Sequence, residues 1–448
     1  MLSYDILIAG AGPAGCAAAY DLARAGKRVL LLDRRTFPRP KACACGLTRK
    51  TLKALRYSVD PVIERVCNEI VLQRGAANSG APFMTASSSW VGSADKSQEV
   101  RIGSRNPICA MAVRERFDDF CLQQTLAAGA ALRKIESIAA LREFPTYIEL
   151  DIVILEDGQQ RTETLRAPVL IGADGSNGQT RRLEHLLRSH GEANSSFAQE
   201  WYTRGFALEA LIPYTALPEK LPGGDAPHDL VFDFSPIPGG YGWLFPKGDH
   251  INIGVGAFAP SDSVPEPATN PGDPSLEASS QRVRSSGATE DSLKQVTRAL
   301  LTHYAHQKLG IATLDNITGQ HLGMGGHAYV PHGRVLLAGD AAGLVDPLTG
   351  EGIHSAIVSG QAAAAAILEV LSPGPWSLDR DLAATYARHL APLQQTLPFS
   401  HRAARAFYRE PERGFRAMKL PFLRSLILKT YADGLPHTRL LTALAKLV

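Results

Sequence analysis

The stretch YDILIAGAGPAGCAAAYDLARAGKRVLLLD, residues 4–33, decides the fold of this 448-residue chain. Its hydrophobic pattern predicts an apolar strand over Tyr4–Ala9, an alanine-rich helix over Ala14–Ala25 and a second strand over Val29–Leu32. A strand, a glycine turn, a helix and a second strand of this length form half of a dinucleotide-binding fold.

The turn between the first strand and the helix carries glycines at a functional spacing. Gly10 permits the tight turn, Gly12 lets the backbone approach a pyrophosphate, and Gly15 allows the helix to pack closely on the strand. Pro13 and Ala14 complete the turn. Asp33, at the end of the second strand, stands where an acid accepts the ribose hydroxyls, and Arg34 either lies near the adenine or is solvated. The turn predicts a dinucleotide without separating FAD from NAD.

A second glycine-rich turn, GDAAGLVDPLTGEGI at Gly339–Ile353, follows a short apolar strand at Val335–Ala338. It ends in a predicted helix start, where free N–H groups and the positive end of the helix dipole attract an anion. Two such turns at opposite ends of the chain favour FAD, bound along its whole length. For Asp340, the alternative is an ordinary helix-capping acid.

Composition narrows the class of protein. The chain is 45% hydrophobic and 20% charged with a net charge of +3, which is ordinary globular composition and too weakly basic to indicate nucleic-acid binding. The six cysteines lack a secreted-scaffold pattern, and no basic and apolar leader precedes the first strand, so we expect free thiols and a cytoplasmic protein. No metal-ligand spacing occurs, and we expect no metal. We also expect no membrane-spanning run.

The order of these signals predicts an α/β protein, α+β overall, with a Rossmann-like FAD-binding domain built from discontinuous segments. We assign 1–65, 105–190 and 310–372 to that domain. Residues 66–104 and 191–309 are assigned to an inserted antiparallel-sheet substrate domain, in which 260–292 forms a mobile surface insertion rich in Pro, Ser and acidic residues. Residues 373–448 are expected to form a helical C-terminal region.

Three motifs in order resemble the FAD-dependent oxidoreductase superfamily with the p-hydroxybenzoate hydroxylase-like fold. They are GAGPAG at Gly10–Gly15, GADGSNGQTRR at Gly172–Arg182 and GDAAGLVDPLTGEGI at Gly339–Ile353. Two further segments resemble the geranylgeranyl reductase family within it: YGWLFPK at Tyr241–Lys247, similar to Y-x-W-x-F-P-K, and KACACGL at Lys41–Leu47, similar to K-x-C-G-G-G-L. Ala44 and Cys45 depart from the second motif.

The resemblance implies a set of FAD contacts. Asp340 would contact the ribityl and pyrophosphate region, the backbone of residues 350–353 would face the flavin ring, and Arg114 would approach the diphosphate. The remaining FAD-binding residues expected from the matched motifs are Lys41, Cys45, Gly46, Asp174, Gly339, Pro347, Gly350, Gly352 and Ile353. Lys41 could equally sit in solvent, and Glu351 could be a proton donor or an ordinary helix-start glutamate.

Tyr241, Trp243 and Phe245 alternate along a predicted strand and so point to one face. They form either an apolar wall that holds an isoprenoid chain over the flavin or the core side of the second sheet. Tyr241 could also donate a proton. Cys43 either approaches the flavin, where a thiol could position the substrate, or is a small residue in a turn. We take Tyr241, Trp243 and Cys43 as the candidate catalytic residues.

The resemblance implies that reduced FAD delivers hydride to a C=C bond of a geranylgeranyl-type isoprenoid chain. NAD(P)H or a ferredoxin-like protein would supply the electrons. One alternative is an FAD-dependent monooxygenase acting on an aromatic or polyketide-like substrate, and another is a membrane-associated flavoprotein that passes electrons to a quinone. From His401 onward ten Lys or Arg and three Asp or Glu alternate with apolar residues. This tail predicts either peripheral contact with an anionic membrane or a helical cap with a solvated basic face.

Overall fold

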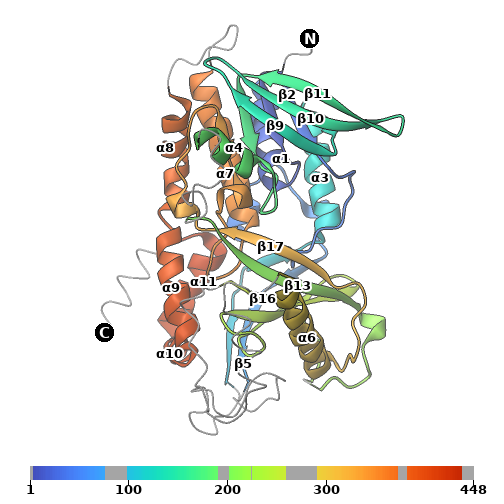
Figure 1. Ribbon diagram of the computed structural model, residues 1–448. Coiled ribbons are helices and arrows are strands. Elements are labelled where there is room, and N and C mark those ends of the chain that lie inside the picture. Colours follow the sequence, from blue (N-terminus) through green and yellow to red (C-terminus); the bar gives the residue numbers. More distant parts are fainter. Residues whose placement is uncertain are drawn as a thin grey trace, which may run out of the picture.

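The computed structural model describes residues 4–75, 98–189, 201–222, 224–258, 290–371 and 381–435. These residues form two parts, one on a parallel sheet near the N-terminus and one on a larger sheet below it in Figure 1. The surface insertion expected over 260–292 lies outside the described residues, apart from 290–292, which begin helix α6.

The first part is a five-stranded sheet in which every neighbouring pair of strands is parallel. Its strands, in order across the sheet, are β18 (Val335–Leu337), β12 (Val169–Gly172), β1 (Ile6–Ala9), β2 (Val29–Asp33) and β8 (Ala131–Lys134). Segments from both ends of the chain therefore meet in one sheet. The predicted Rossmann-like domain of discontinuous segments is confirmed.

Both faces of this sheet are covered, which explains its uninterrupted apolar strands. Ile6 and Ile8 of β1 point into a core formed with helices α1 (Pro13–Arg24), α3 (Arg114–Ala127) and α7 (Ile353–Val370). Leu7 points to the opposite face. That face packs on an antiparallel sheet of β9 (Ser137–Glu143), β10 (Ile148–Glu156) and β11 (Gln159–Ala167) and on helix α4 (Thr180–Arg188).

The second part is a seven-stranded sheet. Its strands, in order, are β17 (Thr318–Met324), β13 (Thr203–Pro213), β16 (His250–Ala257), β15 (Gly240–Pro246), β14 (Leu230–Asp233), β5 (Glu69–Arg74) and β6 (Gln98–Gly103). The predicted antiparallel sheet is confirmed, with one departure, because β14 and β5 pair in parallel. These two strands come from separate chain segments and are not joined by a hairpin turn, which would require an antiparallel pair. Helix α6 (Glu290–Leu309) covers one face.

A small sheet and a short helix connect the two parts. The strands β3 (Gly46–Thr48), β7 (Cys109–Met111) and β4 (Arg65–Cys67) pair in that order, and helix α2 (Arg49–Ala54) follows β3. The seven-stranded sheet turns its second face toward this junction, as the cavity described below shows.

Four C-terminal helices run along the side of both parts in Figure 1: α8 (Leu382–Gln394), α9 (Leu397–Arg409), α10 (Pro411–Ala417) and α11 (Pro421–Asp433). Phe415, Met418 and Leu423 are buried, and the first two join the core of the seven-stranded sheet. Most of the described apolar side chains of this region thus serve a helical cap, while Leu420 and Phe422 are exposed.

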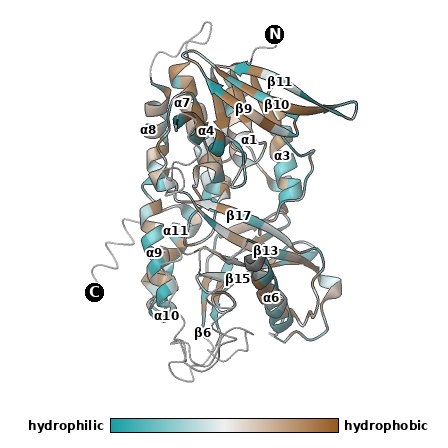
Figure 2. Ribbon diagram, in the orientation of Figure 1, coloured by the Kyte–Doolittle hydropathy of each residue, from teal (hydrophilic) through white to brown (hydrophobic). Residues whose placement is uncertain are grey.

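Within the described residues, one helix is apolar and long enough to cross a membrane. It is α7, with 18 residues and a mean hydropathy of 1.4. Figure 2 shows it predominantly hydrophobic, and 67% of it is buried inside the fold. The packing of α7 against α1 and α8 explains this composition, because a helix enclosed on several sides is apolar on several sides.

Candidate functional site

The two glycine-rich turns face one another across a cavity of about 230 Å³, which we call the inner cavity. An outer cavity of about 980 Å³ adjoins it and shares several of its lining residues. The predicted site residues that line the inner cavity are Gly10, Gly12, Pro13, Ala14, Asp33, Lys41, Cys43, Cys45, Gly46, Arg114, Asp174, Tyr241, Trp243, Gly339, Asp340, Gly350, Gly352 and Ile353. Gly15 and Pro347 do not line it, and Arg34 lines only the outer cavity.

The first turn has the geometry expected of a pyrophosphate-binding loop. Gly10 adopts a φ of +99°, and a side chain there would meet the backbone of Ala173. A Cβ on Gly15 would lie 1.9 Å from the Gly10 carbonyl oxygen, so Gly15 acts through packing and not as a cavity wall. Around Gly12 a Cβ would meet only the Arg39 guanidinium at 3.8 Å. The backbone at Gly12 is therefore open to a ligand.

Asp33 and Asp174, the acids predicted beside the first two motifs, also accept hydrogen bonds from nearby backbone amides. Asp33 accepts hydrogen bonds from the Ala11 and Arg35 amides, each at 2.8 Å. Asp174 accepts from the amides of Gln179 (2.6 Å) and Thr180 (3.0 Å) at the start of α4 and from the Thr180 hydroxyl. The Asp174 carboxylate is thus used by the turn it belongs to, although the residue lines the cavity.

The C-terminal turn contributes the start of α7, whose N-cap is Gly352. Asp340 lies beside it, and burial raises the pKa of Asp340 while the charges of Lys41 and Arg114 oppose that rise. Arg114 is buried and pairs with Asp118 through two contacts of 2.7 Å. Burial, and then the Arg114 charge, lower the pKa of Lys41. The cations Lys41 and Arg114 therefore lie near Asp340 at the start of α7, and this arrangement suits a diphosphate.

The seven-stranded sheet supplies an aromatic wall, which we define as Phe232, Tyr241, Trp243, Phe245 and Phe258. All five line the inner cavity, and none is more than 8% exposed. The ring centroids of Phe232 lie 5.2 Å from Tyr241 and 5.1 Å from Phe245, in edge-to-face contact. These rings belong to the core of the second sheet and also line the cavity, whereas their contact with an isoprenoid chain stays a prediction.

Tyr241 connects this wall to the C-terminal turn. Its hydroxyl donates a hydrogen bond to the Thr349 carbonyl, and burial raises its pKa. Both effects retain the proton on the hydroxyl, which argues against Tyr241 as a proton donor in this arrangement. Its ring contacts make it a positioning side chain of the wall.

The segment from Lys41 to Gly46 forms a turn along the cavity. Cys45 adopts a φ of +47°, in the left-handed region that glycine favours, and stands at one of the two positions where this chain replaces a glycine of the resemblance motif. The Cys43 thiol accepts a hydrogen bond from the Cys45 amide (3.3 Å). All six cysteines are free. The structure therefore brings Cys43 to the cavity as a thiol.

Sequence reasoning assigned no role to three further residues that shape this turn. The buried Lys247 ammonium donates to the carbonyls of Ala44 (2.6 Å) and Ala112 (2.7 Å), and burial lowers its pKa. The buried Glu209 carboxylate accepts from the Cys43 amide (2.8 Å), and Asn252 donates to the same carboxylate. Lys247 ends the YGWLFPK segment, so this motif could have indicated its role. Glu209 and Asn252 lie in strands that match no motif, and no sequence signal marks them.

Glycines in β16 make room for the wall. A Cβ on Gly254 would lie 2.0 Å from the Trp243 indole, and one on Gly256 would lie 2.4 Å from the Phe258 ring. Without these side chains, the Trp243 indole crosses β16, and its N–H donates to Asn252 (2.7 Å). The G-V-G spacing in the sequence was a signal for this close approach.

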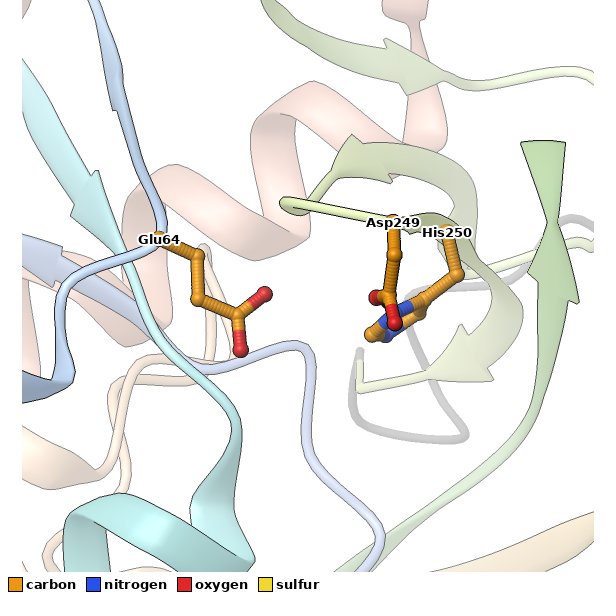
Figure 3. Close-up of side chains that lie close together, drawn as sticks. All are labelled: Glu64, Asp249 and His250. Atoms are coloured by element: carbon orange, nitrogen blue, oxygen red, sulfur yellow. The ribbon is translucent and has the colours of Figure 1, made fainter.

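The described residues also hold one cluster of potential metal ligands, Glu64, Asp249 and His250 (Figure 3). Its carboxylates already have partners. Glu64 pairs with Arg116 and accepts the Gly248 amide at 3.0 Å, and Asp249 binds His250 at 2.6 Å. These contacts explain why the three side chains lie together, because they stabilise the turn between β15 and β16.

Comparisons with known proteins agree with this geometry. A family model described as FAD binding domain matches residues 3–197. A digeranylgeranylglycerophospholipid reductase of Methanopyrus kandleri is 27% identical, covering 83% of this chain and 78% of its own. A menaquinone reductase of Mycolicibacterium smegmatis is also 27% identical, covering 80% and 75%. The crystal structure of a geranylgeranyl bacteriochlorophyll reductase-like protein from Thermoplasma acidophilum has a TM-score of 0.65 at 18% identity and covers 98% of each chain.

The chain is an FAD-dependent oxidoreductase related to the geranylgeranyl reductases. The cavity of this oxidoreductase fits the cofactor. The bare backbone at Gly12 and the cations beside Asp340 suit a diphosphate, and the N-terminus of α7 at Gly352 suits the electron-rich edge of a reduced flavin. The predictions of FAD and of the reductase relationship are confirmed. The individual FAD contacts remain predictions.

Proposed function

We propose that this oxidoreductase reduces C=C bonds in an isoprenoid chain. The observation that carries the proposal is the aromatic wall, whose residues line the inner cavity together with the start of α7. A prenyl chain has no charged group along its length, so an apolar wall is the complement it needs. When bound and reduced, FAD supplies hydride.

The relatives support the same proposal. The relative from Methanopyrus is named for a substrate with geranylgeranyl chains. The test is to reduce the purified, FAD-loaded protein with dithionite under nitrogen and add geranylgeranyl diphosphate. Mass spectrometry should show a prenyl product that has gained one H₂ for each bond reduced. Unchanged substrate, with the flavin still reduced, would overturn the proposal.

A monooxygenase reaction is the alternative from the same fold. It predicts that adding substrate to the NAD(P)H-supplied protein stimulates oxygen uptake, whereas reduction of a C=C bond proceeds without oxygen. An oxygen electrode separates the two. Electron transfer to a quinone is a second candidate, favoured by the relative named menaquinone reductase. A menaquinone whose ring is reduced while its prenyl chain is unchanged would support it.

We also propose that the electrons come from a donor that binds transiently, either NAD(P)H or a ferredoxin-like protein. The sequence contains one complete dinucleotide turn, which FAD would occupy. Rapid-mixing measurements of flavin bleaching with NADPH, NADH and reduced ferredoxin identify the donor. The donor that bleaches the flavin fastest at equal concentration is the assigned one.

An apolar substrate favours peripheral membrane contact, and the described residues suggest where it would occur. Leu420 and Phe422 are 41% and 47% exposed at the start of α11, and Arg416 and Lys419 beside them are exposed cations. Apolar side chains ringed by cations suit an anionic bilayer surface. We propose that this patch touches the membrane.

The variant Leu420→Glu/Phe422→Glu tests this contact. It should abolish co-sedimentation with vesicles containing phosphatidylglycerol, whereas the control Val330→Glu, at a residue 60% exposed on another part of the surface, should bind normally. Equal binding by both variants would refute the patch.

A further inference from the structure

Glu209 is a buried acid that none of the sequence motifs includes. It lies on β13, where Phe206, Leu208, Ala210 and Ile212 point to the core beneath α6. Glu209 alternates with them and so faces the opposite side of the sheet, toward the cavities. A carboxylic acid that is only 6% exposed, on the sheet face that also carries the aromatic wall, needs a physical explanation.

The position of Glu209 between the two cavities provides an explanation for its burial. Glu209 lines both the inner and the outer cavity. The outer cavity is lined by the exposed Arg34, Arg35 and Asp315 and therefore meets solvent. The inner cavity holds the aromatic wall and the start of α7. A group on the boundary can exchange protons with water on one side and act on a substrate on the other.

The other carboxyl groups of the inner cavity are placed differently. Asp340 and Glu351 line the inner cavity but not the outer one. Glu351 is held by Lys50 (2.5 Å) and by the hydroxyls of Thr48 (3.1 Å) and Thr51 (3.3 Å).

Asp33 and Asp174 line both cavities, but they accept hydrogen bonds from backbone amides, Asp33 from Ala11 and Arg35 and Asp174 from Gln179 and Thr180. Of these carboxyl groups, Glu209 is thus the one that belongs to the substrate-side sheet and borders both cavities.

The surroundings of Glu209 permit it to carry a proton. Burial raises its pKa, while the Cys43 amide, Asn252, Lys247 and Arg114 oppose that rise. The charged and titratable groups that face it therefore come from the turn of residues 41–46, from β15–β16 and from α3. Two hydrogen bonds hold the Glu209 side chain in one place. The Cys43 amide donates to it at 2.8 Å, and Asn252, the second donor, is itself fixed by the Trp243 indole at 2.7 Å.

We propose that Glu209 is the acid that supplies the proton of the reduction and regains it from water in the outer cavity. The inference rests on the proposed C=C reductase function. Saturation of a C=C bond forms two C–H bonds, one from a hydride and one from a proton. The Glu209 O–H bond breaks as the second C–H bond forms. The resulting carboxylate takes a proton from solvent, so Glu209 undergoes no net change and no redox step.

The variant Glu209→Gln separates this role from that of an anchor for Cys43. Its amide oxygen still accepts the Cys43 N–H, but it has no acidic proton. With dithionite-reduced protein and geranylgeranyl diphosphate, we expect the rate of flavin reoxidation to fall by about 100-fold or more. Bound FAD per protein should stay unchanged. Glu209→Asp, which keeps the acid, should recover part of the rate.

The pH profile provides a readout that an anchor would not change. In the wild type the reoxidation rate should fall as pH rises and the acid loses its proton, and in Glu209→Gln the rate should no longer follow that titration. If Glu209→Gln retains FAD and reoxidises at the wild-type rate with the wild-type profile, Glu209 is only an anchor and the inference is wrong.

A measurement without substrate keeps the two proposals distinguishable. An infrared difference spectrum of flavin photoreduction should contain a protonated-carboxyl C=O band that Glu209→Gln lacks and Glu351→Gln retains. Absence of that difference would overturn the proton-carrying role even if the wild type reduces the prenyl chain. Failure of the wild type to reduce the chain, with the band present, would overturn only the proposed reaction.

Discussion

Replacing Gly254 by alanine tests the packing on which the aromatic wall depends. Gly254 pairs with Trp243 on one side and with Glu209 on the other. A methyl group there would lie 2.0, 2.4 and 2.6 Å from the Cζ2, Cε2 and Cη2 atoms of the indole. Ordinary contact begins near 3.4 Å, so the buried indole would have to move by roughly 1.4 Å in a close-packed interior.

The energetic cost follows from two contributions. Overpacking of this kind costs about 1–3 kcal/mol. Displacing the indole also breaks its 2.7 Å hydrogen bond to Asn252, which costs about 1 kcal/mol more. Alanine is better than glycine in a strand by roughly 0.5–1 kcal/mol, which offsets part of the loss. We therefore expect Gly254→Ala to lower the free energy of unfolding by about 1–3.5 kcal/mol.

Urea unfolding of the FAD-loaded protein, followed by far-ultraviolet circular dichroism, measures this change. The matched control is Gly103→Ala in β6 of the same sheet, where a Cβ would meet only the Glu69 carboxylate at 3.8 Å. The control should be neutral or slightly stabilising. Equal unfolding free energies for Gly254→Ala and the wild type would refute the reasoning.

A double variant identifies the clashing group. Phenylalanine at position 243 lacks the outer indole atoms that the new methyl meets. Gly254→Ala/Trp243→Phe should therefore lose less stability than the sum of the single variants, by about 1–3 kcal/mol. Single-variant effects that simply add would show that the methyl clashes with something other than the indole.

Three further predictions follow from other contacts. Gly15→Ala places a Cβ 1.9 Å from the Gly10 carbonyl and should abolish FAD retention, measured as flavin absorbance per purified protein. Burial, and then the Lys50 charge, lower the pKa of His354 from 6.5 to about 4. The unfolded chain thus binds this proton at higher pH than the folded one, and stability should fall by up to about 3 kcal/mol as pH drops from 6.5 to 4, a slope that His354→Gln removes. Lys247→Met leaves the Ala44 and Ala112 carbonyls without their donor and should lower the unfolding free energy by about 2–4 kcal/mol and speed alkylation of Cys43.

Each of the three has a contrary result. Normal flavin content in Gly15→Ala would contradict the close helix–strand contact. Parallel stability curves for His354→Gln and the wild type between pH 6.5 and 4 would show that another group governs acid sensitivity. Unchanged Cys43 alkylation in Lys247→Met would mean that the turn of residues 41–46 is held by its other contacts.

Local sequence was sufficient for the parts of this protein that depend on local geometry. The glycines at 10, 12 and 15 require a particular turn between a strand and a helix, and the resulting unit could be predicted because each glycine acts on atoms close in sequence or on the ligand. The same holds for the start of α7, since a helix N-terminus is an anion site whatever surrounds it. Alternation along Tyr241–Phe245 predicted a shared face for the same reason.

Only the tertiary structure decided what those faces meet. The contact between Cys43 and Glu209 joins residues 166 positions apart, and Lys247 reaches Ala44 across 203 positions. No local pattern marks either pairing, because a single buried acid or lysine in a strand has no periodic signal. The parallel pairing of β5 with β14 was missed for the same physical reason. Burial, which converts Glu209 from an ordinary carboxylate into a candidate proton carrier, arises only once distant segments are packed together.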